Sequence, residues 1–279
     1  MKTLKKITLL SFFIAAFTVK SQTPFEVTVT GEGQPILLFP GFTCTAAVWE
    51  DTVTELAKNY ECHIFTFAGF GGVTPVEKPW LPKIKEGISN YVEEQKLNSP
   101  IVIGHSLGGA LGLWLATDEN HTYSKLIIVD ALPSTGALMM PNFKSENMVY
   151  DNPWNKQMLE MGEEAFEKMA TQMASGMTLN TEKREQLKDW IIASDRKTYV
   201  YGYTDLLKLD LREDIAKIRI PVTVLGATHP YGIETAKKTY QEQYKNLESY
   251  KIEFAEEAAH FIMYDQPDWF LNQILNALK

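Results

Sequence analysis

Short apolar runs alternate with longer amphipathic segments along most of this chain. Runs such as ILLF and LIIV match strands buried on both faces, and the segments between them have apolar residues at helical spacing. This alternation predicts an α/β fold with a mostly parallel central sheet and helices on both faces. The predicted strands are 25–30, 35–40, 62–68, 100–104, 126–130, 221–226 and 251–255, the first of them antiparallel. The predicted helices of this sheet domain are 48–58, 82–95, 107–117, 232–245 and 269–278.

The 90 residues between Asp130 and Pro221 contain no clear strand. They show helical periodicity near 155–175, 182–194 and 197–209. An insertion of this size at one point of a parallel sheet indicates a helical cap. We place the cap at 135–215 and the sheet domain at 22–134 and 216–279.

Eight of the ten methionines lie between Met139 and Met177, within the predicted cap. Methionine fills irregular cores, and it also lines adaptable apolar pockets. Both interpretations are open at this point: the cluster is either core packing or the wall of a binding pocket.

The first 21 residues have the pattern of a signal peptide. Lys2, Lys5 and Lys6 precede an uncharged apolar run of thirteen residues, 7–19. This run is shorter than the ~20 residues of a membrane-spanning helix, but it matches the apolar region of a secretory signal. We therefore expect cleavage after Ser21 and a periplasmic or secreted protein. The alternative is an uncleaved N-terminal anchor helix.

Composition narrows the possible partners. The 279-residue chain has a net charge of −8. Removal of 1–21 with its four lysines would leave 23 basic and 35 acidic side chains, a net charge of −12. Such a protein repels nucleic acid and anionic lipid surfaces. We expect a small-molecule substrate, no nucleic-acid partner and no stable membrane association after signal cleavage.

The two cysteines, Cys44 and Cys62, are predicted to be buried free thiols. Cys44 follows the C-terminal end of one predicted strand, and Cys62 begins the next. In neighbouring parallel strands of about six residues these ends lie ~20 Å apart, beyond the reach of a disulfide.

The most specific chemical signal is the segment Gly104-His105-Ser106-Leu107-Gly108. It follows a buried strand and opens an apolar helix, which is the setting of a nucleophile elbow. The sharp turn lifts the Ser106 hydroxyl above the sheet, and the two glycines keep side chains out of the turn. The N–H groups at the start of the helix favour negative charge nearby. Ser106 is the predicted nucleophile.

A second segment, Pro40-Gly41-Phe42, ends the strand that contains ILLF. With the elbow, it resembles the α/β-hydrolase superfamily, in which a His-Gly-X segment at this place supplies an oxyanion N–H. Pro40 stands here where many relatives have His. The resemblance implies an α/β-hydrolase fold with a helical cap inserted after strand 6. It also implies an oxyanion hole formed by the backbone N–H groups of Phe42 and Leu107.

Ala259-His260-Phe261, after the last predicted strand, resembles the catalytic histidine segment of the superfamily in position and chain order. A serine hydroxyl needs a base within hydrogen-bond reach, and histidine titrates near working pH. We predict that His260 is the general base. The other four histidines are weaker candidates.

The third member of the triad is harder to assign. Most relatives carry an Asp after the strand that corresponds to VTVLG, but here the sequence continues Ala227-Thr228-His229 without an acid. Some relatives place the acid one strand earlier, where this chain has Asp130. Asp130 would have to reach across one strand spacing to orient His260. Glu234 and a Ser–His dyad without an acid stay open as alternatives.

These features predict an exported serine esterase that acts on modest, mainly apolar, neutral substrates through an acyl-enzyme. None of the four arginines lies in a motif, which argues against a substrate defined by a carboxylate. Amide or peptide hydrolysis, C–C hydrolysis and perhydrolysis are compatible with the same residues, and so is a ligand-binding sensor with slow turnover. The chain has no P-loop and no common metal-binding spacing, and we predict no cofactor and no metal.

Overall fold

A computed structural model describes residues 23–120, 122–140 and 142–279, so the predicted signal peptide lies outside the described residues. The described chain forms a sheet in the order β1-β3-β2-β4-β5-β6-β7. Only β1 is antiparallel, as predicted for the first strand. The strands are β1 (Phe25–Thr30), β2 (Gln34–Phe39), β3 (Tyr60–Phe67), β4 (Ile101–His105), β5 (Lys125–Val129), β6 (Val222–Ala227) and β7 (Lys251–Ala255).

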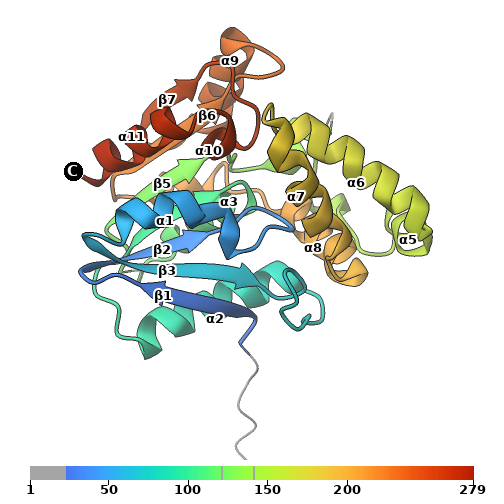
Figure 1. Cartoon of the computed structure of the whole chain (residues 1–279), viewed down its shortest axis with the longest axis horizontal. Coiled ribbons are helices and arrows are strands. Elements are labelled where there is room, and N and C mark those ends of the chain that lie inside the picture. Colours follow the sequence, from blue (N-terminus) through green and yellow to red (C-terminus); the bar gives the residue numbers. More distant parts are fainter. Residues whose placement is uncertain (1–22, 121, 141) are drawn as a thin grey trace, which may run out of the picture.

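Helices cover both faces of this sheet (Figure 1). Alternate strand residues point to opposite faces, so Leu37 packs in one core and Ile36 in the other. The first core includes α2 (Trp80–Glu94), α3 (Leu107–Ala116) and side chains at the end of α9 (Ile233–Gln243). The second core contains η1 (Ala46–Trp49), α1 (Glu50–Leu56), α10 (Ile262–Asp265) and α11 (Pro267–Leu278). Burial on both faces explains why the central strands are continuous apolar runs.

The helical insertion lies beyond the carboxyl ends of the parallel strands (Figure 1). It contains α4 (Thr135–Met139), η2 (Ser145–Asn147), α5 (Pro153–Glu160), α6 (Glu163–Met177), α7 (Thr181–Ile192) and α8 (Arg196–Lys208), with η3 (Asp214–Lys217) after it. Counted along the described chain, the insertion follows β5 and precedes β6. The helical stretch predicted at 155–175 is two helices, because the chain is extended at Met161 and Gly162.

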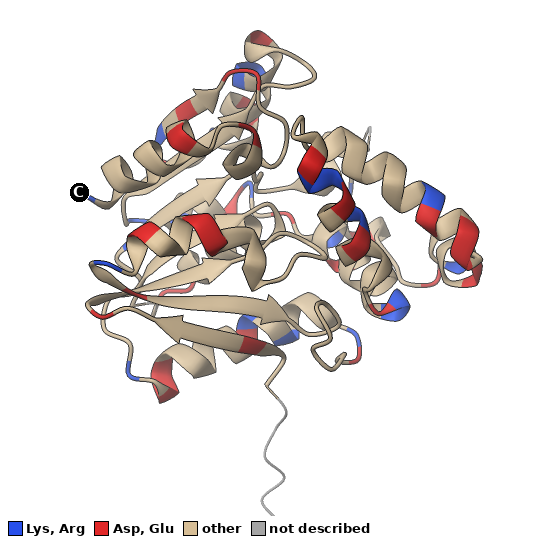
Figure 2. Cartoon of the chain, in the orientation of Figure 1, with Lys and Arg blue, Asp and Glu red and all other residues tan. Residues whose placement is uncertain are grey.

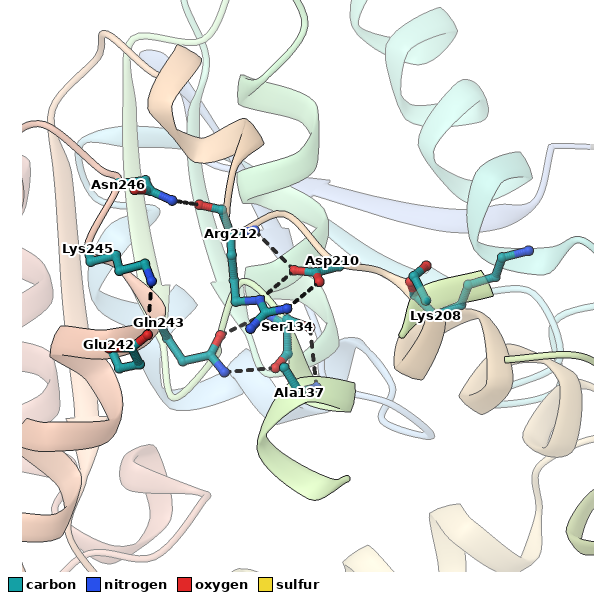
Figure 3. Close-up of polar contacts among 10 residues, drawn as sticks. Ser134, Ala137, Lys208, Asp210, Arg212, Glu242, Gln243, Lys245 and Asn246 are labelled. Atoms are coloured by element: carbon teal, nitrogen blue, oxygen red, sulfur yellow. Dashed lines mark hydrogen bonds and ion pairs between the residues drawn. The ribbon is translucent and has the colours of Figure 1, made fainter. Parts of the chain in front are cut away.

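Polar contacts fasten the base of the cap to α9 (Figure 3). The side-chain amide of Gln243 donates to the carbonyl of Ser134 and accepts from its N–H, both at 3.1 Å. Asn246 donates to the carbonyl of Arg212 at 2.7 Å, and the Arg212 guanidinium pairs with Asp210. The two segments that connect the cap to the sheet domain are therefore both tied to the region around the end of α9.

Both cysteines are buried and free, as predicted, and burial raises the pKa of the Cys62 thiol to about 11. Lysines and arginines are scattered over the sheet domain and the cap and do not gather on one face (Figure 2). No helix in the described ranges combines the length and apolar character needed to cross a membrane.

Candidate active site

Ser106 lies in the sharp turn between β4 and α3. Its φ of 54° and ψ of −118° are strained values for a residue with a side chain. The turn is held by the Ser106 N–H, which donates to the carbonyl of Val129 at 2.9 Å. A Cβ on Gly104 would lie 2.3 Å from the carbonyl oxygen of Gly108, so a side chain cannot fit there. The segment therefore has the geometry that the sequence predicted for an elbow.

His260 lies after β7, and its ring meets Asp130 at the end of β5. The Nδ1–H of His260 donates to Oδ2 of Asp130 at 2.6 Å. This bond fixes the ring so that Nε2 carries the lone pair. The carboxylate reaches across one strand position to the ring, as predicted for Asp130.

Two further donors hold the Asp130 carboxylate. Its Oδ1 accepts from the N–H of Ala227 at 2.8 Å and from the hydroxyl of Tyr240 at 2.7 Å. Burial by itself would raise the pKa of Asp130, but the hydrogen bonds from His260, Ala227 and Tyr240 and the charge of His260 outweigh it and lower that pKa. Ala227 occupies the strand end at which most relatives carry the acid, and here its backbone supports the acid from the neighbouring strand.

Sequence reasoning missed Tyr240. Apolar periodicity in α9 indicates that Ala236 and Tyr240 face the core, and both are buried. That pattern carries no information on which polar group meets the phenol, because Asp130 is 110 positions away.

The alternative acid, Glu234, is not near the ring. Its side chain is 85 % exposed in the first turn of α9, and Lys237 donates to it at 3.4 Å. The structure brings Asp130, and not Glu234, to His260.

His105 is a second imidazole in contact with His260. It is fully buried, its ring centroid lies 4.6 Å from that of His260, and its Nε2–H donates to the His260 carbonyl at 2.9 Å. Burial and the neighbouring His260 lower the pKa of His105 to about 3, so the ring is neutral. A Cβ on Gly41 would come within 2.8 Å of its Nδ1, which explains a glycine at position 41.

Phe42 and Leu107 lie beside Ser106, at the end of β2 and the start of α3. No hydrogen-bond acceptor among the described residues engages either backbone N–H. The Phe42 ring packs at 5.0 to 6.2 Å from Phe70, Trp80, Tyr199 and Tyr203, which fixes this backbone segment against α8. Two unoccupied N–H groups next to a strained serine can receive the negative charge of an oxyanion.

A cavity of about 670 Å³ brings these residues together. Ser106, His260, Asp130 and Phe42 line it, and the cap closes it with Met139, Met173 and Met177. Among the described residues, no lysine, arginine or glutamate lines the cavity, and Asp130 is the one carboxylate that does. Met158, in contrast, is buried in the core of the cap, and Met161, Met169 and the pocket residue Met173 pack against this core. The methionine cluster thus divides between pocket wall and core packing.

Nothing in the described ranges resembles a metal centre, since no three His, Cys, Asp or Glu side chains there are grouped suitably. The groups that the site brings together are a serine, an imidazole paired with a carboxylate, and backbone N–H groups.

Comparison with known proteins places the chain. The model of the alpha/beta hydrolase family matches residues 36–273. The chain belongs to the alpha/beta hydrolase family, and it is a hydrolase. Among curated proteins it is similar to the pimeloyl-[acyl-carrier protein] methyl ester esterase of Vibrio atlanticus, with 24 % identity over 70 % of this chain and 75 % of the relative. The enzyme of that name from Aeromonas hydrophila is 24 % identical over 88 % of this chain and 95 % of its own length.

Solved structures show the same fold at low sequence identity. The enol-lactonase of Burkholderia xenovorans has a TM-score of 0.74 and 15 % identity, covering 91 % of this chain and 96 % of its own. An esterase from Exiguobacterium antarcticum has a TM-score of 0.75 and 15 % identity over 91 % and 96 % of the two chains. The family and fold predicted from the elbow and the histidine segment are confirmed.

Proposed function

We propose that the chain is an exported serine esterase that hydrolyses modest, mainly apolar, neutral esters with Ser106, His260 and Asp130 as its triad. The observation that carries this proposal is the 2.6 Å hydrogen bond between His260 and Asp130 in the cavity that Ser106 lines. The ester-hydrolysing relatives support the type of bond.

The proposed reaction uses groups that line the cavity or border Ser106. Nε2 of His260 takes the Ser106 proton while Oγ attacks the ester carbonyl carbon. The carbonyl oxygen gains negative charge and is stabilised by the N–H groups of Phe42 and Leu107. His260 then donates its proton to the departing alcohol oxygen, which leaves an acyl-enzyme. Water attacks the acyl carbon with His260 again as base, the bond between the acyl carbon and Oγ of Ser106 breaks, His260 returns the proton to Oγ, and the acid is released.

The cavity supports a neutral substrate. A charged acyl or alcohol group would lose its hydration in this cavity, and none of the described lining residues is a lysine, arginine or glutamate that could compensate. The carboxylate of Asp130 accepts from three donors, so it is not free to pair with a cationic substrate. An aliphatic group, in contrast, meets apolar side chains of the cap.

Export rests on the N-terminal sequence alone. We propose that the Sec-type pattern of residues 1–21 directs the chain to the periplasm or medium and that cleavage follows Ser21. The mass of the protein recovered from its native cell fraction tests this. A chain that begins at residue 22 supports export, and a chain that retains Met1 refutes cleavage.

The esterase proposal is tested with a panel of chromogenic acyl esters and the Ser106→Ala variant. The parent should hydrolyse short and medium acyl esters, and the variant should lose on the order of 10⁴-fold or more in turnover. Ester hydrolysis near the parent rate in purified, folded Ser106→Ala would overturn the mechanism.

A further inference from the structure

The cavity has two walls of unlike chemistry. We define the cap wall as Leu138, Met139, Met173, Met177 and Ile191, all of them apolar. We define the α9 wall as Thr235, Ala236, Thr239 and Tyr240. Thr228, His229 and Tyr231, which precede this helix, also line the cavity, and the hydroxyl of Thr228 donates to the carbonyl of Ala255 at 3.0 Å.

The α9 wall is one face of a helix. Thr235 and Thr239 are one turn apart, as are Ala236 and Tyr240, so all four side chains point to the same side. In the described part of the chain the hydroxyls of Thr235 and Thr239 have no hydrogen-bond partner. Each hydroxyl can both donate to and accept from a bound group.

The described part of the cap lines the cavity mainly with apolar side chains and contributes a single threonine, Thr135. The two tyrosines of α8 that line the cavity turn their hydroxyls to methionine sulfurs, Tyr199 to Met173 at 3.4 Å and Tyr203 to Met139 at 3.3 Å. Thr43 and Thr135 also line the cavity, each on a different element, whereas Thr235 and Thr239 form a pair of hydroxyls on one face of α9.

The α9 wall belongs to the His260 side of the cavity. Tyr240 connects it to Asp130, which in turn holds the His260 ring. Gln243, at the end of the same helix, is bonded twice to Ser134 at the base of the cap (Figure 3). The wall thus has a fixed position relative to both His260 and the cap. The alcohol oxygen of an ester must approach His260 to receive its proton, whereas the oxyanion lies toward Phe42 and Leu107.

We propose, on the basis of the esterase function proposed above, that the α9 wall binds the alcohol portion of the ester and that this portion is uncharged and hydroxylated, as in a glycerol or other polyol ester. The acyl chain then lies against the cap wall. Hydroxyls of the alcohol pair with the exposed Thr235 and the half-buried Thr239, whereas methyl groups in their place form no hydrogen bonds with these threonines. Discrimination therefore rests on hydrogen bonds rather than on charge.

The test uses the Thr235→Val/Thr239→Val double variant, which removes both hydroxyls and keeps the side-chain shape. Two matched pairs of esters are compared by kcat/KM. Glycerol monobutyrate is paired with 2-methylbutyl butyrate, in which methyl groups replace both hydroxyls. Methyl 3-hydroxybutanoate and methyl 3-methylbutanoate form the same pair on the acyl side. Thr171→Val, on the exposed face of α6, is the control for the substitution itself.

The parent should prefer glycerol monobutyrate to its methyl analogue, and the double variant should lower this ratio about tenfold, since each neutral hydrogen bond contributes a factor of roughly 2 to 10. The ratio for the acyl pair should change by less than about twofold, and Thr171→Val should change neither ratio.

A change confined to the acyl pair, or in neither pair, overturns the proposal. A parent that hydrolyses none of the four esters and does not react with a fluorophosphonate refutes the esterase function instead. Melting temperatures confirm that all variants are folded.

Discussion

The hydroxyl of Tyr240 donates a hydrogen bond of 2.7 Å to Oδ1 of Asp130, the carboxylate oxygen that His260 does not use. A buried tyrosine therefore supports an acid that stands at the end of β5 rather than β6. Burial raises the pKa of Tyr240 well above its usual range, so the phenol keeps its proton and acts as the donor.

Removal of this donor should leave the Asp130 carboxylate less well held and slow the reaction. Tyr240→Phe should lower kcat/KM about tenfold, because a hydrogen bond to a charged group contributes roughly 1.5–3 kcal/mol. The control is Tyr244→Phe, one turn further on, whose ring stacks on Tyr240 and whose hydroxyl donates to the carbonyl of Ala131. The control should lose about 1 kcal/mol of stability and keep its activity. Equal losses of activity in the two variants would show that Tyr240 acts through packing and not through its hydrogen bond to Asp130.

The same change has a defined pH signature. The lowered pKa of Asp130 means that its ionised form stabilises the fold above the pKa of the unfolded state, and this stabilisation is lost as pH falls through the folded value. Tyr240→Phe raises the folded pKa toward the unfolded one, so acid unfolding should begin at higher pH. Urea titrations at a series of acidic pH values measure this, and an acid limb identical to that of Tyr244→Phe would contradict it.

Asp130 itself should be essential for fast turnover. Asp130→Asn can present an amide N–H to Nδ1 of His260 and favour the wrong tautomer, which should cost up to ~10⁴ in kcat by analogy with serine proteases. Glu234→Gln, on the exposed face of α9, should cost little. Rates must be compared at equal folded fraction, because Asp130 also accepts from Ala227. If Asp130→Asn keeps its activity and Glu234→Gln loses it, the acid of the triad is Glu234 on α9. If both variants keep their activity, the enzyme works as a Ser–His dyad.

His105 should position His260 through the backbone. His105→Gln can keep the hydrogen bond to the His260 carbonyl, whereas His105→Leu leaves that buried acceptor unpaired at a cost of about 1–3 kcal/mol. We expect the Leu variant to lose stability and kcat and the Gln variant to recover much of both. Two variants of equal kcat would show that this hydrogen bond does not position His260.

The methionines of the cap should differ in their effect on acyl preference. The double variant Met173→Ala/Met177→Ala makes the cavity larger at the cap wall. The ratio of kcat/KM for longer to shorter acyl esters should then rise about tenfold, because one methylene contributes roughly 1–3 kcal/mol in an apolar pocket. Met161→Ala/Met169→Ala, in the core of the cap, should lower the melting temperature without moving the ratio. A fixed ratio in both pairs would assign the whole cluster to core packing.

Local patterns were enough to predict much of this molecule. The sheet was predictable because strands buried on both faces are continuous apolar runs such as ILLF and LIIV. The elbow at Ser106 was predictable because a strand-to-helix turn of this kind needs glycines at fixed positions. Asp130 could be predicted as the acid of the triad only because no acid follows VTVLG. The support from Ala227 and Tyr240 depends on contacts between distant segments, which no local pattern encodes. The break between α5 and α6 is marked only by Gly162, and the helical periodicity on either side concealed it.

The central claim, a nucleophilic Ser106 activated by His260, is tested most directly by labelling the purified protein with a fluorophosphonate and mapping the modified peptide by mass spectrometry. The account predicts one adduct, on Ser106, that forms rapidly in the parent, slowly in Asp130→Asn and not at all in Ser106→Ala. An adduct on another residue, or no adduct on a folded protein that hydrolyses esters, would contradict it.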